Sequence, residues 1–191
     1  MPTVDLHAHV VVPDAVHRMR AAHPDYAPTL CREDAWTIRI PGHAPMSPVP
    51  QGMFDTQVRL DDMDRRRVDL QLLSVPPPHF FYQVPPAVGA EFAAVQNDAM
   101  IEVSHRHPER LHVLATLPLQ DPPAATREIS RVAHHRLIRG VEIGTNVNGR
   151  PLDAGEFEPV WAALEDADLP VWLHPDQRTI AGADRLTSYY L

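Results

Sequence analysis

Short apolar runs alternate with longer amphipathic segments along most of this chain, and this alternation limits the folds open to it. Strands are predicted at 3–10, 68–74, 111–117, 140–144 and 170–174. Helical periodicity is found at 58–67, 88–105, 122–137 and 153–167. Strands that alternate with helices form parallel β-α-β units, in which ligands bind beyond the carboxyl ends of the strands. The sequence therefore predicts an α/β fold with its functional site at that edge.

The stretch 13–52 interrupts this alternation directly after the first predicted strand. It is rich in proline and mixed in polarity, which predicts a short helix at 14–22 followed by a lid-like excursion. We interpret it as an insertion within a single domain that spans residues 1–191.

The composition narrows the class of partner. With 191 residues and 44% hydrophobic content, the chain can bury one sizeable core. The 17 basic and 25 acidic side chains give a formal charge of -8 without a basic tract, which argues against nucleic acid and anionic membrane partners and favours a small molecule. The sequence contains neither a long apolar span nor a signal-peptide pattern, and we expect a cytoplasmic protein.

Several mechanisms lack the residues they need. All 17 basic residues are arginine, so a Schiff-base lysine, a phosphate-loop lysine and a carboxylated bridging lysine are excluded. Cys31 is the only cysteine, which rules out an internal disulfide framework. The motifs of phosphate-binding loops and serine hydrolases are also absent. Metal chemistry remains the favoured candidate.

Two histidines lie two positions apart in the first predicted strand. Alternating strand residues share a face, so His7 and His9 would reach one point, with Asp5 on the same face and an apolar, buried face opposite. His174 ends the last predicted strand and could supply a third metal ligand. On the His7–His9 pair alone, two ordinary histidines near a chain start remain an open alternative.

Several separate motifs, in order, carry a resemblance to a known family. They are VDLHAH at 4–9, VRL at 58–60, MD at 63–64, VDLQLLS at 68–74, TLP at 116–118, GVEIGTNVN at 140–148 and LHP at 173–175. Together they resemble the amidohydrolase superfamily, specifically its branch of metal-dependent decarboxylases typified by aminocarboxymuconate-semialdehyde decarboxylase. The resemblance implies an eight-stranded (β/α)8 TIM-barrel fold of the metal-dependent hydrolase type.

The resemblance also implies the residues of a site. His7, His9 and His174 would bind one divalent metal, usually Zn2+ in the family. A mononuclear site is favoured, because binuclear members commonly carry a carboxylated lysine on the fourth strand, where this chain has Glu142 and Ile143. Whether Glu142 points into the barrel or onto a helix is left open. Arg59 matches an arginine that grips the substrate carboxylate; without the resemblance it would be a solvated helix residue.

The function implied is non-oxidative decarboxylation of an unsaturated or aromatic carboxylic acid. The metal would lower the pKa of a bound water to about 7 and Arg59 would hold the small-molecule carboxylate substrate. One alternative is a hydrolase of the same superfamily that opens a lactone or an amide. A second is a non-catalytic, truncated remnant.

The length of the chain carries its own expectation. A complete barrel usually needs about 250 residues and eight strands, whereas about five β-α units are predicted here. We therefore expect a C-terminally truncated barrel that lacks the family's fourth metal ligand and general base, is poorly stable and has weak activity. The full-length protein would be a homodimer.

Overall fold

A five-stranded parallel sheet forms the centre of the structure, a computed structural model that describes residues 1–32 and 34–175. Its strands, in spatial order, are β1 (Val4–His9), β4 (Leu70–Ser74), β5 (Leu111–Ala115), β6 (Ile138–Gly144) and β9 (Val171–His174). Every neighbouring pair is parallel and follows chain order. Such a singly wound sheet is an arc of an (β/α)8 barrel, which confirms the predicted α/β class.

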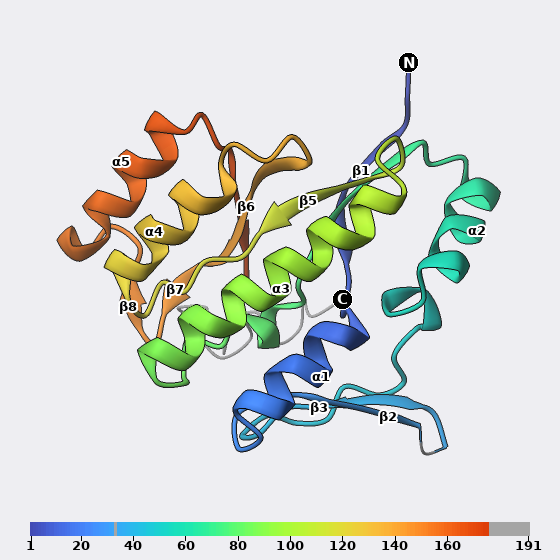
Figure 1. The fold of residues 1–191 in the computed structure, drawn as a ribbon, viewed down its shortest axis with the longest axis horizontal. Coiled ribbons are helices and arrows are strands. Elements are labelled where there is room, and N and C mark those ends of the chain that lie inside the picture. The colour runs from blue at the N-terminus through green and yellow to red at the C-terminus, as the bar shows by residue number, and fades with distance from the viewer. Residues whose placement is uncertain (33, 176–191) are drawn as a thin grey trace, which may run out of the picture.

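Helices cover the sheet from one side. They are α2 (Thr56–Arg66), α3 (Pro86–Arg106), α4 (Pro122–Val132) and α5 (Glu158–Asp166). Figure 1 shows α3, α4 and α5 along one side of the strands, with α2 beyond β1. Among the described residues, no helix is long and apolar enough to cross a membrane.

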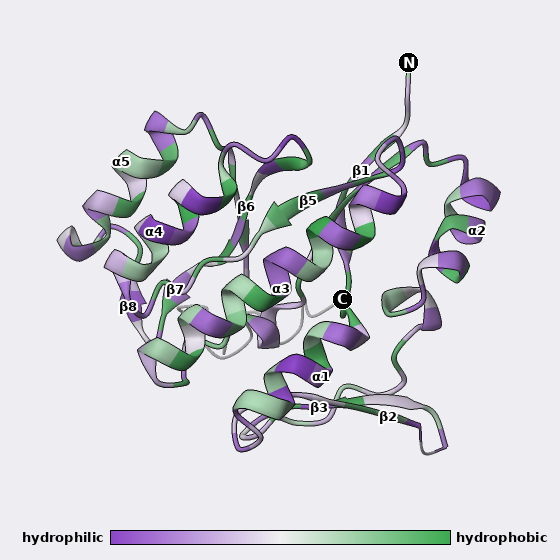
Figure 2. Cartoon of the chain, in the orientation of Figure 1, coloured by the Kyte–Doolittle hydropathy of each residue, from purple (hydrophilic) through white to green (hydrophobic). Residues whose placement is uncertain are grey.

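The main core lies between the strands and these helices. Leu73, Val113 and Val141 on the central strands are fully buried, and Met100 of α3 and Ile129 of α4 belong to the same cluster. The helices alternate apolar and polar positions, whereas β5 is largely apolar (Figure 2). This pattern is expected for strands that are covered on their faces.

Short elements complete the loops at the carboxyl ends of the strands. The 3-10 turn η2 (Pro77–Phe80) follows β4 and η3 (Gly155–Phe157) precedes α5. The two-residue strands β7 (Asn146–Val147) and β8 (Arg150–Pro151) pair as a small antiparallel ladder after β6. They keep the loop after β6 close to the end of the sheet.

The insertion 13–52 contains more regular structure than predicted. The expected helix is present as α1 (Pro13–Ala22), and it is followed by an antiparallel hairpin of β2 (Thr29–Arg32) and β3 (Trp36–Arg39) and by the turn η1 (Gln51–Met53). The insertion has a core of its own, in which Met19 and Ile38 pack with Phe92 of α3. Figure 1 shows α1 and the hairpin together below the sheet. A lid function for this segment stays a prediction.

The predicted helix 122–137 is too long by its last turn. α4 ends at Val132, and the carbonyl of Leu137 accepts a hydrogen bond from the amide of Val113 at 2.9 Å. Ile138 then pairs with Val113 as the first residue of β6. Pairing with β5 therefore removes these apolar residues from the helical pattern that local periodicity favours.

The first strand departs from regular alternation. Asp5 pairs with Gln71 and Ala8 with Leu73, so β1 has one extra residue in that interval, a β-bulge. The predicted buried apolar face is therefore wrong in part: Ala8 is buried, but Leu6 is 49% exposed. Asp5 is also absent from the group of ligand atoms around His7 and His9, because the bulge changes which side chains share a face.

Candidate metal centre

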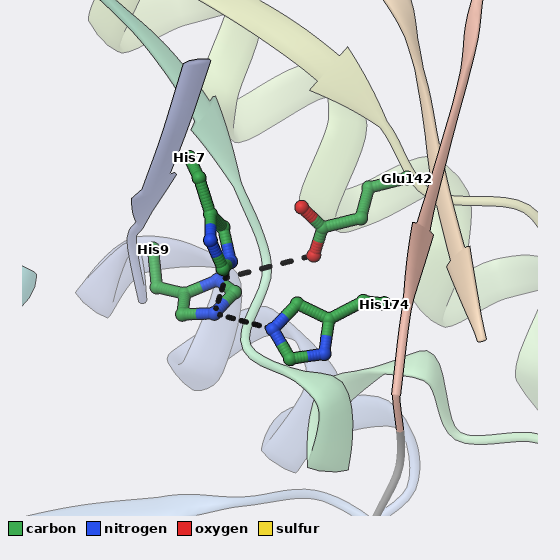
Figure 3. A group of neighbouring side chains, drawn as sticks. All are labelled: His7, His9, Glu142 and His174. Atoms are coloured by element: carbon green, nitrogen blue, oxygen red, sulfur yellow. Dashed lines mark hydrogen bonds and ion pairs between the residues drawn. The ribbon is translucent and has the colours of Figure 1, made fainter. Parts of the chain in front are cut away.

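Three imidazoles meet at the carboxyl ends of β1 and β9. The Nε2 atoms of His7 and His9 lie 3.1 Å apart, and those of His9 and His174 lie 3.3 Å apart. Figure 3 shows the three rings turned toward one another from the two strands. The structure thus brings together all three histidines that the sequence singled out as metal ligands.

The second ring nitrogens have partners that orient the rings. His174 Nδ1 lies 2.8 Å from the carbonyl oxygen of Pro175, which can only accept a hydrogen bond, so Nδ1 is the donor and Nε2 is the nitrogen turned toward His9. Ser74 Oγ lies 3.3 Å from His9 Nδ1. Partners of this kind commonly fix the ring orientation of histidines that bind metals.

The environment keeps His9 in the neutral form that a metal ion requires. Burial and, after it, charge repulsion from the neighbouring His7 and His174 together lower the pKa of His9 to about 3. Burial, followed by His174, also lowers the pKa of His7. A metal ion would not have to compete with a proton at these rings near neutral pH.

A buried carboxylate completes the group. Glu142 lies in the middle of β6 with no exposed surface, and its Oε1 is 3.9 Å from His9 Nδ1. One ligand atom from each of Glu142 and the three histidines falls within 4.8 Å of the others. Burial raises the pKa of Glu142 to about 7. The question left open by the sequence is therefore decided, since Glu142 points toward the histidines (Figure 3).

The donor set fits a divalent ion. Two nitrogens bound at about 2.0–2.1 Å to one tetrahedral ion lie about 3.3 Å apart, which agrees with the 3.1 and 3.3 Å separations of the Nε2 atoms. Imidazole nitrogens with a carboxylate oxygen suit Zn2+, Fe2+ or Mn2+. Neither carboxylate oxygen of Glu142 makes a hydrogen bond of normal geometry with the described residues, as expected for oxygens that bind a cation.

Arg59 lies beside this centre rather than in solvent. The residue is only 8% exposed; its Nη1 donates to Gln71 Oε1 at 2.9 Å and its Nη2 to the carbonyl of His9 at 2.5 Å. Burial lowers the pKa of Arg59 to about 10, so the guanidinium stays charged at neutral pH. Gln71 Nε2 in turn donates to Asp5 Oδ2 at 3.0 Å.

A cavity of about 470 Å³ opens at the guanidinium. Arg59, His9 and Gln71 line it together with Met53 of η1 and Val58 of α2. A guanidinium has five N–H donors, so the two hydrogen bonds to Gln71 and His9 do not exhaust its capacity. The cavity can therefore hold a small anion against the fixed positive charge of Arg59, on the side of the site that His9 borders.

Comparison with known proteins decides the family. A sequence model described as amidohydrolase matches residues 4–187, nearly the whole chain. The chain belongs to the amidohydrolase family. Decarboxylases stand among its similar proteins. The 2-amino-3-carboxymuconate-6-semialdehyde decarboxylase of Dictyostelium discoideum is 31% identical over 143 residues, which are 75% of this chain and 39% of that protein.

Solved structures share the fold of this chain. The 5-carboxyvanillate decarboxylase of Sphingomonas paucimobilis superposes with a TM-score of 0.72 at 29% identity, covering 91% of this chain and 52% of that one. The corresponding enzyme of Novosphingobium aromaticivorans, complexed with manganese, gives a TM-score of 0.72 at 20% identity over 98% of this chain and 53% of that one. The amidohydrolase chain described here spans about half the length of such relatives.

Sequence reasoning identified the histidines and did not identify Glu142 as part of the group. The available signal is its position, since Glu142 stands alone between Val141 and Ile143 in an apolar strand. A single carboxylate in such a strand rarely lacks a partner. The positions of Ser74 and Gln71 around the site could not be read from the sequence, because both depend on the pairing of β4 with β1.

Proposed function

We propose that this amidohydrolase is a metal-dependent, non-oxidative decarboxylase of a small aromatic or unsaturated carboxylic acid. The observation that carries the proposal is the convergence of the Nε2 atoms of His7, His9 and His174 at the carboxyl end of the sheet. The decarboxylases among its relatives support the reaction class, since one acts on a carboxymuconate semialdehyde and others on carboxyvanillate.

The side chains have separate tasks in this proposal. The three imidazoles hold one divalent ion, which would supply Lewis acidity and lower the pKa of a bound water to about 7. Arg59 holds a carboxylate of the substrate in the adjacent cavity through paired charge-assisted hydrogen bonds. In decarboxylation CO2 leaves and a proton takes its place on the carbon. By holding the carboxylate, the fixed charge of Arg59 also orients the acid toward the metal side.

Zn2+ is the ion that we propose first. Three histidine nitrogens at these separations suit its tetrahedral geometry, with further positions open to carboxylate or solvent. Mn2+ is the competing choice, because it accompanies the Novosphingobium aromaticivorans enzyme. Metal analysis of the protein purified without added ions will distinguish the two.

The test combines metal content with release of carbon dioxide. The purified chain, loaded with Zn2+ or Mn2+, is incubated with 5-carboxyvanillate and related hydroxybenzoates labelled with 13C in the carboxyl group. We expect labelled CO2 from the wild type and none from His7→Ala, His9→Ala or His174→Ala, each of which also loses the metal. His107→Ala, at the C-cap of α3, is the matched control and should retain both properties.

The other outcomes separate the alternatives. Ring opening of lactones or amides without CO2 would identify a hydrolase of the same family. Bound metal without turnover of any acid would support a non-catalytic remnant. Full metal occupancy in His7→Ala or His9→Ala would contradict the ligand assignment itself.

A further inference from the structure

Glu142 differs from every other buried carboxylate described in the structure. Glu128, the other buried glutamate among the described residues, is paired: it accepts from Asn97 Nδ2 at 2.6 Å and from Arg131 Nε at 2.8 Å. Both oxygens of Glu142 are buried, and among the described residues neither makes a hydrogen bond of normal geometry; burial raises its pKa, and the nearby Ser74 hydroxyl offsets that rise only in part. A buried ionised carboxylate without a cation is strongly unfavourable, so a cation beside Glu142 would stabilise its charged form.

The position of Glu142 in the sheet directs it to the histidines. β6 and β9 are adjacent and parallel, with Glu142 opposite Trp172 and Gly144 opposite His174. Glu142 thus lies two residues closer to the amino-terminal end of the sheet than the position opposite His174. Its Oε1 reaches to 3.9 Å from His9 Nδ1 (Figure 3).

A hydrogen bond to His9 does not explain this placement. The separation of 3.9 Å exceeds that of a hydrogen bond, and Ser74 Oγ is nearer to the same nitrogen at 3.3 Å. The carboxylate is therefore not the partner that orients His9. It remains available to an ion held by the three imidazoles, since its ligand atom lies within 4.8 Å of each of theirs.

We infer that Glu142 is a carboxylate ligand of the divalent ion that His7, His9 and His174 hold, so that β6 supplies a fourth protein ligand. The inference rests on the metal centre of the proposed function. It also fixes the charge of the site, because one carboxylate and three neutral imidazoles around a divalent ion give a net charge of +1. Such a site favours Zn2+ or Mn2+ over ions that prefer soft ligands.

Co2+ titration of the purified chain tests the inference without measuring turnover. The visible absorption of Co2+ depends on the number and type of its ligands, and competition with a chelating dye gives the dissociation constant. The variants are Glu142→Gln, which keeps size and removes charge, and Glu142→Asp, which keeps charge and shortens reach. Glu128→Gln is the control, because it removes a buried carboxylate away from the site. Circular dichroism verifies that each variant is folded.

We expect Glu142→Gln to bind Co2+ at least about 10-fold more weakly than wild type and with an altered absorption spectrum, and Glu128→Gln to match wild type. Glu142→Asp should retain a spectrum with a carboxylate ligand. Wild-type affinity and spectrum in Glu142→Gln would overturn the inference. Weaker binding with an unchanged spectrum would also overturn it, since Glu142 would then act through His9.

Failure of the proposed function gives different results. If the wild type bound no Co2+, the metal centre and the ligand role of Glu142 would both be wrong. If metal bound through Glu142 but no acid released CO2, the decarboxylase proposal would fail while the ligand assignment stood.

Discussion

Arg59 shows how one side chain can serve both the fold and the site. Its guanidinium donates hydrogen bonds to the backbone carbonyl of His9 and to the side-chain oxygen of Gln71. It also faces the cavity where a carboxylate substrate is proposed to bind. The bond to His9 ties α2 to the strand that carries two of the three histidines. Loss of Arg59 should therefore affect stability as well as substrate binding.

Arg59→Ala is predicted to lower the free energy of unfolding by about 1–3 kcal/mol, because two partly buried acceptors lose a charged donor. Urea denaturation followed by circular dichroism measures the change. Arg66→Ala is the control on the same helix; this arginine is exposed and forms a surface salt bridge with Asp62. Equal midpoints for the two variants would contradict the structural role of Arg59.

His79 should make stability depend on pH in the acid range. It is 1% exposed, its Nδ1 lies 3.1 Å from Gln96 Oε1, and burial lowers its pKa to about 4. The unfolded chain binds a proton at this residue below pH 6.5 and the folded chain does not. Its contribution to stability is therefore complete above pH 6.5 and is lost as the pH falls toward 4, by at most about 3 kcal/mol.

His79→Asn removes this titration and keeps a donor in the place of Nδ1. We predict that its urea midpoint falls less than that of the wild type between pH 7 and pH 4.5. Parallel midpoint curves for the two proteins would show that His79 is not held neutral by the fold.

At the scale of elements, the contact between β6 and β9 controls the site. Val141 donates its amide to the carbonyl of Pro170 at 2.9 Å, which begins the pairing that carries His174 to its place. Gly140 allows this approach, because a Cβ atom there would lie 2.5 Å from the Pro170 oxygen. A side chain at position 140 would displace the start of β9.

Gly140→Ala is predicted to destabilise the protein by about 1–3 kcal/mol through overpacking against backbone. It should also weaken metal binding, since the displacement moves His174 relative to His9. Urea denaturation and Co2+ titration measure the two effects. Gly155→Ala is the control, because a Cβ atom there meets no atom within 4 Å. An unchanged metal affinity in Gly140→Ala would show that the β6–β9 contact does not control the position of His174 in the site.

At the scale of the whole molecule, curvature of the sheet assembles the centre. β1 and β9 are the first and last strands of the described sheet, four steps apart. In a flat sheet they would lie about 19 Å apart, at about 4.8 Å per step. Their histidines nevertheless approach to 3.3 Å, because the sheet curls and its concave face brings the two ends together. A bound ion would link the two ends of the sheet.

Metal binding is therefore predicted to stabilise the whole fold. A divalent ion at 100 times its dissociation constant should add about 2.7 kcal/mol to the free energy of unfolding, and EDTA should remove this increment. Thermal denaturation with Zn2+ and with EDTA measures it. His174→Ala should abolish the difference between the two conditions, while His107→Ala should keep it. A difference that persists in His174→Ala would place the stabilising ion elsewhere.

The sequence by itself determined the alternation of strands and helices and two of the imidazoles at one strand end. These properties follow from local periodicity, which is set within a few residues. Local patterns could not reveal the bulge in β1, the early end of α4 or the β2–β3 hairpin. In each case the decisive interaction is pairing or packing with a distant segment, which overrides local preference.

The tertiary structure alone decided the composition of the site. The partner of His9 in the imidazole group lies 165 residues away in the chain, and only the curvature of the sheet joins them. The same curvature turns Glu142 toward the histidines, and the packing of α2 against β1 buries Arg59, which by its helix pattern alone would be solvated. Side-chain direction across a concave face depends on register and curvature, and neither is encoded in any short stretch of sequence.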